Sequence, residues 1–114
     1  MIYCYDPSHD KWTTLPPLPI RRFGLGQVCG KLVAIGGEKK SGGITNEVYT
    51  YDERSQKWKQ TIPPMPTARC TRIVLSLQSA PVVAGGYTPS RNTTDIVEIF
   101  KPDTVQWYTA NRLW

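Results

Sequence analysis

Residue types that could carry catalysis are sparse in this sequence of 114 residues. Its single histidine, His9, stands beside Asp10 in a segment rich in turn-forming residues. A copper or zinc site needs several convergent ligands, and an activated nucleophile needs a base that a third group orients. One histidine supplies neither arrangement. A catalytic pair that uses no histidine is the remaining alternative. The sequence therefore predicts a protein that is not an enzyme and that holds neither a metal nor another cofactor.

The cysteines and a glycine pair have simpler explanations than reactivity. Cys4, Cys29 and Cys70 form no Cys-x-x-Cys motif. We expect them to be small buried hydrophobic residues in a reducing compartment, which predicts a cytoplasmic location. Gly24 and Gly26 precede no helix, so they do not form a phosphate-binding fingerprint. No apolar run approaches the ~18 residues of a membrane span, so no membrane interaction is predicted.

Basic side chains exceed acidic ones, with 14 lysines and arginines against 9 aspartates and glutamates and a net charge of +5. Such an excess can attract anionic partners, including nucleic acid. The longest basic clusters are the pairs Arg21-Arg22 and Lys39-Lys40, which is too little for a nucleic-acid interface. We therefore predict no nucleic-acid binding and treat these pairs as candidates for recognition of another acidic partner.

An internal repeat organises the segments that must position these side chains. An aromatic residue precedes a tryptophan by seven positions three times, and twice the second glycine of a Gly-Gly pair lies 21 positions before that tryptophan. The residues of this signature are Tyr5, Trp12, Gly36, Gly37, Tyr51, Trp58, Gly85, Gly86, Phe100 and Trp107. Proline-rich segments at 15–19 and 62–66 separate the copies. The fixed register indicates that the tryptophans are structural and do not stack on nucleic-acid bases.

The segments between these anchors have β-strand chemistry. Residues 31–35 and 80–84 are short apolar runs that end in Gly-Gly, and residues 47–51 and 95–100 are rich in β-branched and aromatic side chains. No segment shows a helical period. Two copies are each predicted to contain four strands, a to d, at 23–28, 32–36, 46–51 and 56–60, and at 70–77, 81–85, 95–100 and 105–109. Residues 2–6 and 11–14 are predicted to be the c and d strands of an earlier copy.

The combination of Gly-Gly, spaced aromatic residue and spaced tryptophan, at a period near 50 residues, resembles the kelch repeat. The resemblance covers nearly the whole chain. It implies an all-β fold in which four antiparallel strands form one blade of a kelch-type β-propeller. It assigns residues 1–20 to the c and d strands of a partial blade plus a connection, residues 21–60 and 61–109 to complete blades, and residues 110–114 to the start of the next connection.

Length sets a limit on the wheel that these blades can form. Propellers carry about four to eight blades, so two complete blades and part of a third do not close a ring. We therefore expect an incomplete wheel, with the remaining blades in a longer protein. Self-association of several copies into a wheel is the alternative.

The resemblance also implies where a partner would bind. In kelch wheels the b–c and d–a loops gather at one face, where such proteins commonly bind peptides; here the b–c loops span 38–46 and 87–94. The predicted partner-binding residues are Lys39, Lys40, Tyr87, Arg91, Arg21, Arg22 and Arg69. Six of these residues are basic, and the loops contain one acidic residue, Glu38. The whole net charge of +5 can therefore be assigned to this face, which favours an acidic peptide. Bonding to neighbouring backbone is the alternative for Arg22 and Arg69. An ordinary solvated loop is the alternative for Lys39, Lys40, Tyr87 and Arg91.

By resemblance, the chain is expected to be a protein-interaction scaffold. Kelch wheels often form the substrate-recognition end of ubiquitin-ligase adaptors that carry a BTB or F-box domain, or act as actin-associated cytoskeletal scaffolds. Galactose oxidase resembles kelch proteins in fold and carries copper, so histidine ligands in further blades would favour an enzyme. The sequence identifies neither an accessory domain nor the partner.

Overall fold

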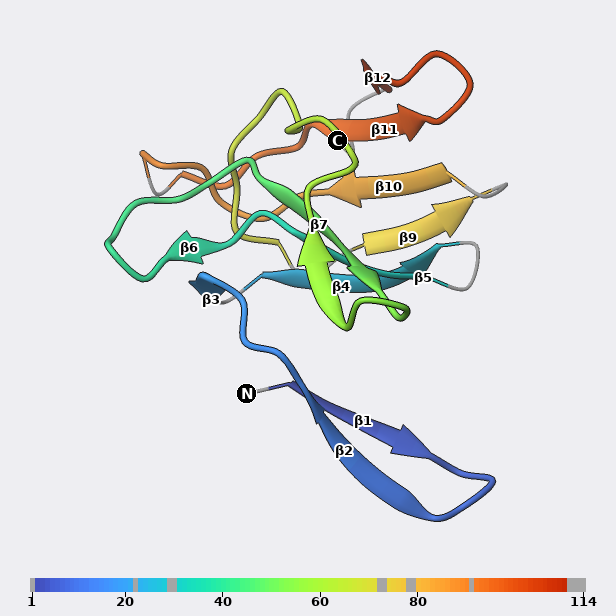
Figure 1. The fold of residues 1–114 in the computed structure, drawn as a ribbon. Coiled ribbons are helices and arrows are strands. Elements are labelled where there is room, and N and C mark those ends of the chain that lie inside the picture. The colour runs from blue at the N-terminus through green and yellow to red at the C-terminus, as the bar shows by residue number, and fades with distance from the viewer. Residues whose placement is uncertain are drawn as a thin grey trace.

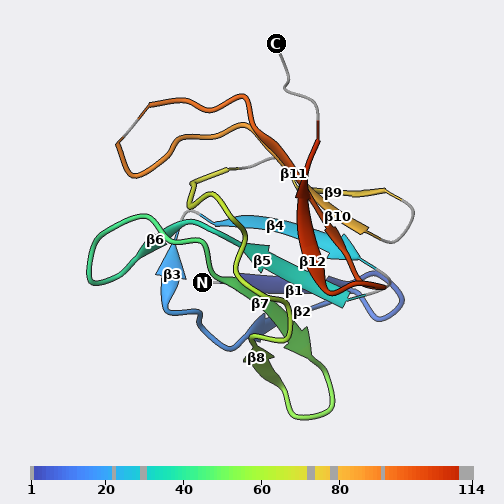
Figure 2. The ribbon, with the colours of Figure 1, turned by 90° about the horizontal axis from the view of Figure 1, so that it is seen from above.

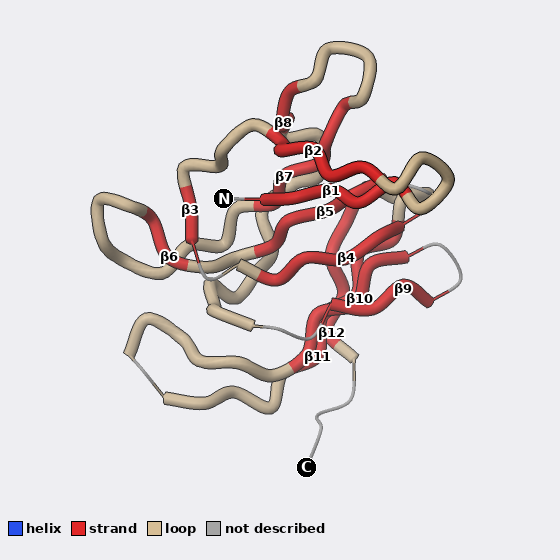
Figure 3. The backbone as a smooth tube through the Cα atoms, turned by 90° about the horizontal axis from the view of Figure 1, so that it is seen from below, coloured by secondary structure: helices blue, strands red, loops and turns tan. Residues whose placement is uncertain are grey.

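The computed structural model describes residues 2–21, 23–28, 31–71, 74–77, 80–90 and 92–110. These residues form strands, turns and loops, and none of them lies in a helix (Figure 3). The described strands make two four-stranded antiparallel sheets, a two-stranded ribbon at the N-terminus and a short two-stranded sheet (Figure 1). The prediction of an all-β fold built from four-stranded antiparallel sheets is therefore confirmed.

Strand order within each large sheet follows the chain, apart from β6, which lies in a loop. The first sheet has the order β4-β5-β7-β8 and contains β4 (Gly24–Val28), β5 (Lys31–Ile35), β7 (Val48–Asp52) and β8 (Lys57–Lys59). The second sheet has the order β12-β11-β10-β9 and contains β9 (Val74–Leu77), β10 (Ala80–Ala84), β11 (Val97–Lys101) and β12 (Gln106–Thr109). Each sheet is thus a meander in which successive strands pair through hairpins and one longer loop.

The N-terminal ribbon consists of β1 (Ile2–Asp6) and β2 (Lys11–Leu15). Among the described residues no other strand pairs with either of them. As a result Cys4 on β1 is exposed, and the prediction that it is buried is wrong. Cys70 is buried as predicted, and Cys29 lies outside the described residues.

Apolar side chains cover both faces of the first sheet. On one face Val33, Ile35 and Val48 join Met65 and Val83 in a cluster that links the first sheet to the second. The opposite face contributes Ala34 to a second cluster with Leu18 and Ile20, which precede the sheet in the chain. Because successive residues of a strand point to opposite faces, the run 33–35 can serve both clusters. The first sheet is therefore held between the connection before it and the sheet after it.

The tryptophans fasten each sheet to the proline-rich segment that precedes it. The indole N–H of Trp58 donates to the carbonyl oxygen of Pro16 at 2.8 Å, and that of Trp107 donates to Pro63 at 2.8 Å. Both indoles are half-buried, whereas Trp12 of the N-terminal ribbon is 67% exposed. The constant spacing of tryptophan and proline segments in the sequence therefore reflects a recurring contact between neighbouring repeats.

The aromatic residue seven positions earlier is the cross-strand partner of each tryptophan. The register pairs Tyr5 with Trp12 and Tyr51 with Trp58, and it pairs Phe100 with Trp107 in the second sheet. The three ring-centroid distances are 4.8, 5.2 and 5.5 Å, in the range of favourable aromatic pairs. The same turn joins each pair of strands, and it places Asp10, Gln56 and Val105 at φ values of 51°, 55° and 54°.

Candidate functional site

The loops between β5 and β7 and between β10 and β11 project from the same end of the two sheets. Figure 2 shows both loops on the left, while the hairpin turns of β1–β2 and β11–β12 lie on the right. The first loop spans residues 38–46 and the second spans residues 87–94. We call this end of the sheets, with the connections that precede each sheet, the rim. The gathering of loops implied by the repeat is therefore present in the structure.

A Gly-Gly pair turns the chain into each rim loop. Gly37 and Gly86 have φ values of 100° and 88°, a region that other residues rarely occupy. A Cβ atom at Gly37 would lie 2.6 Å from the carbonyl oxygen of Arg21, and one at Gly86 would collide with the carbonyl oxygen of Cys70. Because those neighbours are backbone atoms, glycine is required for the rim loops to approach the connections this closely.

Backbone pairing holds both loops against the connections. Strand β3 (Ile20–Arg21) pairs antiparallel with β6 (Glu38–Lys39) in the first repeat. In the second repeat Cys70 and Tyr87 exchange two backbone hydrogen bonds of 2.9 and 3.0 Å. Two-residue strands carry no detectable period, so sequence reasoning did not find them. Through these backbone hydrogen bonds, each rim loop is fixed to the connection that precedes its sheet.

The rim loops are themselves closed hairpins. In the first, the Lys39 amide donates to the Gly43 carbonyl at 2.9 Å, and the Gly42 amide donates back to Lys39 at 2.8 Å. In the second, the Thr88 amide donates to the Asn92 carbonyl at 3.0 Å. The described residues at the two tips, 40–43 and 89–90, are exposed. The molecule thus presents two ordered polar hairpins next to each other at one end (Figure 3).

The basic side chains of the rim are only partly neutralised. Arg21 lies 3.3 Å from Glu38, and Lys39 lies 3.4 Å from Glu47, with more than half of each basic side chain exposed. Lys40 is exposed and forms no ion pair with a described residue. The exposed cations predicted for the rim are therefore present at these three positions.

Of three other predicted rim residues, Tyr87, Arg22 and Arg91, the structure describes Tyr87 alone. Tyr87 is half-buried and contributes its backbone to the pairing with Cys70. Arg22 and Arg91 lie outside the described residues, so their role in partner binding stays a prediction.

Glu47 forms the centre of a polar network that the sequence did not reveal. Its carboxylate accepts hydrogen bonds from Thr45 at 2.9 Å, Tyr49 at 2.8 Å and Gln60 at 2.7 Å. Burial works to raise the pKa of Glu47, but the bonds from Tyr49, Thr45 and Lys39 outweigh it and lower that pKa. Burial, followed by the bond to Glu47, raises the pKa of Tyr49 to about 12. Glu47 therefore stays ionised and offsets part of the positive charge that the sequence assigned to the rim.

Arg69 is not a surface residue of the rim, and its assignment as a partner contact is wrong. Its side chain is fully buried, where the guanidinium group lies 2.7 Å from the Glu98 carboxylate. It also donates to the carbonyl oxygens of Gly85 at 3.1 Å and Ile96 at 2.7 Å. The alternative that this arginine bonds neighbouring backbone agrees with these contacts. Arg69 ties the connection to β11 inside the second sheet.

The histidine cluster does not have the geometry of a catalytic triad. Both Ser8 Oγ, at 3.0 Å, and Asp6 Oδ2, at 2.8 Å, contact the same ring nitrogen, Nδ1 of His9. A relay needs the carboxylate on one ring nitrogen and the nucleophile on the other. The three side chains are exposed in the β1–β2 turn, where the cluster fastens that turn.

In the part of the chain that the structure describes, no group of three or more His, Cys, Asp or Glu residues is placed to hold a metal ion. No helix in those residues is long and apolar enough to cross a membrane.

Comparison with known proteins agrees with this architecture. Residues 20–66 match the Kelch motif. The chain is 30% identical to F-box/kelch-repeat protein SKIP30 of Arabidopsis thaliana, in a match that covers 90% of this chain and 33% of that protein. It is also 30% identical to Kelch-like protein 7 of Rattus norvegicus, in a match that covers 96% of this chain and 18% of that protein. The solved structure of YjhT superposes with a TM-score of 0.74 at 17% identity, covering 90% of this chain and 42% of that one.

These matches identify the fold as a β-propeller. The two four-stranded sheets are adjacent blades, joined by short connections. The β1–β2 ribbon has the same aromatic pairing and the same turn as β7–β8 and β11–β12, and its assignment to the c and d strands of an earlier blade stays a prediction. The chain belongs to the kelch-repeat family. It spans about a third or less of the length of the two curated relatives named above.

Proposed function

We propose that the rim binds a segment of a partner protein and that the chain acts as a non-enzymatic recognition module. The observation that carries this proposal is the pair of exposed hairpins held side by side against the connections at one end of the blades. Loops placed by a rigid scaffold are common binding surfaces because they can vary without disturbing the core. Here the scaffold is the pair of blades, and the presented residues are 38–46 and 87–94.

The names of the relatives support a role in substrate recognition. One is an F-box/kelch-repeat protein and others are Kelch-like proteins. Kelch wheels often form the substrate-recognition end of ubiquitin-ligase adaptors, so we propose that this chain belongs to such an adaptor. The rim is then the surface that would meet the protein to be modified.

The charge of the rim favours an acidic segment of the partner. Lys40 offers a cation that is unpaired among the described residues, and the pairs Arg21–Glu38 and Lys39–Glu47 are partly exposed at 3.3 and 3.4 Å. Exposed pairs of this kind contribute about 0–1 kcal/mol, so a carboxylate of the partner can replace the internal one at little cost. Salt screens such contacts over a Debye length of about 10 Å at 0.1 M, and affinity should fall as salt is added.

Selection from a random peptide library on the immobilised protein tests the proposal. We expect the enriched peptides to be rich in aspartate and glutamate. The affinity of one synthetic enriched peptide is then measured for the wild type, for the rim variant Lys39→Gln/Lys40→Gln, and for the control variant Lys11→Gln/Lys57→Gln. The control removes the same charge from exposed positions beside the c–d turns, at the other end of the blades.

The rim variant should bind the peptide about tenfold more weakly, since two lost pairs of about 0.7 kcal/mol each amount to a factor of ten. The control variant should bind within about twofold of the wild type. Enriched peptides without acidic residues would contradict the acidic partner. Equal losses in both variants would contradict the location of the site at the rim.

A further inference from the structure

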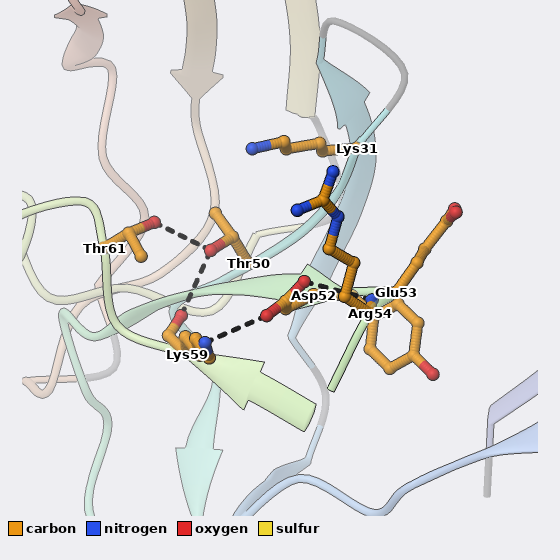
Figure 4. Close-up of a pocket in the computed structure, with 8 residues that line it drawn as sticks. Lys31, Thr50, Asp52, Glu53, Arg54, Lys59 and Thr61 are labelled. Carbon is orange, nitrogen blue, oxygen red and sulfur yellow. Dashed lines mark hydrogen bonds and ion pairs between the residues drawn. The ribbon is translucent and has the colours of Figure 1, made fainter. Parts of the chain in front are cut away.

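A second polar region lies at the end of the first blade that is opposite to the rim. It surrounds a cavity of about 650 Å³ close to the c–d turn (Figure 4). A volume of this size is typical of sites for small ligands. The described residues that line it are Lys31, Thr50, Tyr51, Asp52, Glu53, Arg54, Lys59 and Thr61. We call this cavity the turn pocket.

The turn pocket lies on the face of the first blade that also carries its apolar contact with the second blade. The register pairs Val33 with Thr50 and Thr50 with Lys59, so these side chains lie on the same face of the sheet. Val33 belongs to the cluster that links the first blade to the second. Toward the c–d turn this face changes from apolar to charged.

The one carboxylate near the centre of the pocket is already engaged. Asp52 lies 2.9 Å from the Lys59 ammonium group and also accepts hydrogen bonds from the Arg54 amide at 3.1 Å and the Ser55 hydroxyl at 2.9 Å. The bond from Lys59, followed by that from Ser55, lowers the pKa of Asp52 to about 2. Asp52 is therefore ionised at neutral pH, and its charge is balanced by Lys59.

Two further cations of the pocket have no such balance. Lys31 and Arg54 form no ion pair with a described residue. Figure 4 shows the Arg54 side chain extending toward Lys31, while the Glu53 carboxylate points away from both. Two like charges that share a cavity repel each other, and an anion between them would remove that repulsion. The hydroxyl groups of Thr50 and Thr61, 2.7 Å apart, add a polar wall.

We propose that the turn pocket binds a phosphate monoester, with its phosphate between Arg54 and Lys31. A phosphate monoester carries about −1.5 to −2 charges at neutral pH, which matches two unpaired cations. The planar guanidinium group of Arg54 can donate two parallel hydrogen bonds to phosphate oxygens, and Lys31 supplies a point charge. Because the cavity is larger than a phosphate ion, it has room for the organic group that bears the phosphate. This site is separate from the rim and does not depend on the function proposed for it.

Thermal unfolding of the full-length protein in the presence of inorganic phosphate tests this proposal. Chloride replaces phosphate in matched samples so that ionic strength stays constant. A ligand that binds the folded state raises the midpoint in a saturable way, and the curve yields the dissociation constant. We expect saturation with phosphate and not with chloride. The same titration with a phosphoserine peptide and its unphosphorylated form separates two sources of the phosphate.

The variants Lys31→Gln and Arg54→Gln should each weaken phosphate binding by about tenfold, as loss of a charge-assisted bond predicts. Lys57→Gln is the matched control, because Lys57 is an exposed lysine on β8 that does not line the pocket. It should change the affinity by less than about twofold.

Tighter binding of the phosphoserine peptide than of free phosphate would identify a modified side chain of a partner as the ligand. Equal binding of the two would show that the pocket recognises the phosphate group alone and would rule out a phosphorylated peptide as its preferred ligand. Absence of a saturable response to both probes would overturn the proposal, as would a Lys31→Gln/Arg54→Gln double variant that responds like the wild type. The rim variant Lys39→Gln/Lys40→Gln should keep the phosphate response, so failure at one site can be told from failure at the other.

Discussion

Replacement of Glu98 by leucine should be among the most destabilising single changes in these blades. Glu98 is 1% exposed and is paired with Arg69, which is fully buried. Removal of the carboxylate leaves the guanidinium charge in the interior without its counter-ion. Loss of one partner of a buried pair costs about 3–5 kcal/mol of the free energy of unfolding.

The size of this loss can be separated from the loss of packing by a second variant. In Arg69→Met/Glu98→Leu both charges are removed together, so no uncompensated charge stays buried. The double variant still loses the bonds that Arg69 donates to Gly85 and Ile96. We nevertheless expect it to be more stable than Glu98→Leu alone, because a lost neutral acceptor contact costs less than an unpaired buried charge.

Urea unfolding, monitored by tryptophan fluorescence, provides the free energies of unfolding for this comparison. Glu53→Leu serves as the control for removal of a carboxylate, since Glu53 is exposed and should change stability by about 0.5 kcal/mol or less. A cost below about 1 kcal/mol for Glu98→Leu would refute the buried pair. The single variant Arg69→Met completes the comparison, and a double variant that loses the sum of the costs of Arg69→Met and Glu98→Leu would refute the coupling between the charges.

Three further predictions concern the turns, the tryptophans and one tyrosine. Val105→Asn should raise the free energy of unfolding by about 1 kcal/mol, because a β-branched residue at a φ of 54° is strained and Val105 is 56% exposed. Denaturant unfolding measures this free energy, and an unchanged or lower value would contradict the strain. Trp58→Phe should cost about 1–2 kcal/mol through loss of its bond to Pro16, whereas Trp12→Phe should cost less than about 0.5 kcal/mol; equal costs would show that the contact between repeats is unimportant. Tyr49 should ionise near pH 12 in an absorbance titration, and Tyr49→Phe should remove that step. Since its folded pKa lies above the ordinary value of 10.0, its stabilising contribution is complete below pH 10 and lost as the pH rises through about 12.

The repeat signature predicted most of the fold because its residues make the same contacts in successive blades. Each tryptophan pairs with the aromatic residue seven positions earlier, and Gly37 and Gly86 occupy turns that exclude a side chain. Such contacts leave a fixed spacing in the sequence. The left-handed turn residues also recur two positions before each tryptophan, and aligning the repeats could have identified Val105 as the unfavourable member.

The site was less predictable because its decisive contacts join segments that have no fixed relation in the sequence. Arg69 meets Glu98 across 29 positions, and a repeat alignment does not show which residue faces a given arginine. The one signal in the sequence was that Glu98 is a charged residue between two apolar residues, Val97 and Ile99, of a predicted strand. Glu47 was placed at the edge of a strand, and its effect on the charge of the rim became clear from its ion pair with Lys39 at 3.4 Å.

Hydrogen exchange of the full-length protein, free and bound to a peptide selected from the random library, tests the central claim most directly. If the rim binds the partner, backbone amides in 38–46 and 87–94 should gain protection on binding, because those loops contact the peptide. The c–d turns at 52–57 and 101–106 should exchange at the same rates in both states. Protection confined to the c–d turns, with unchanged exchange in both rim loops, would contradict the account and move the binding site to the opposite end of the blades.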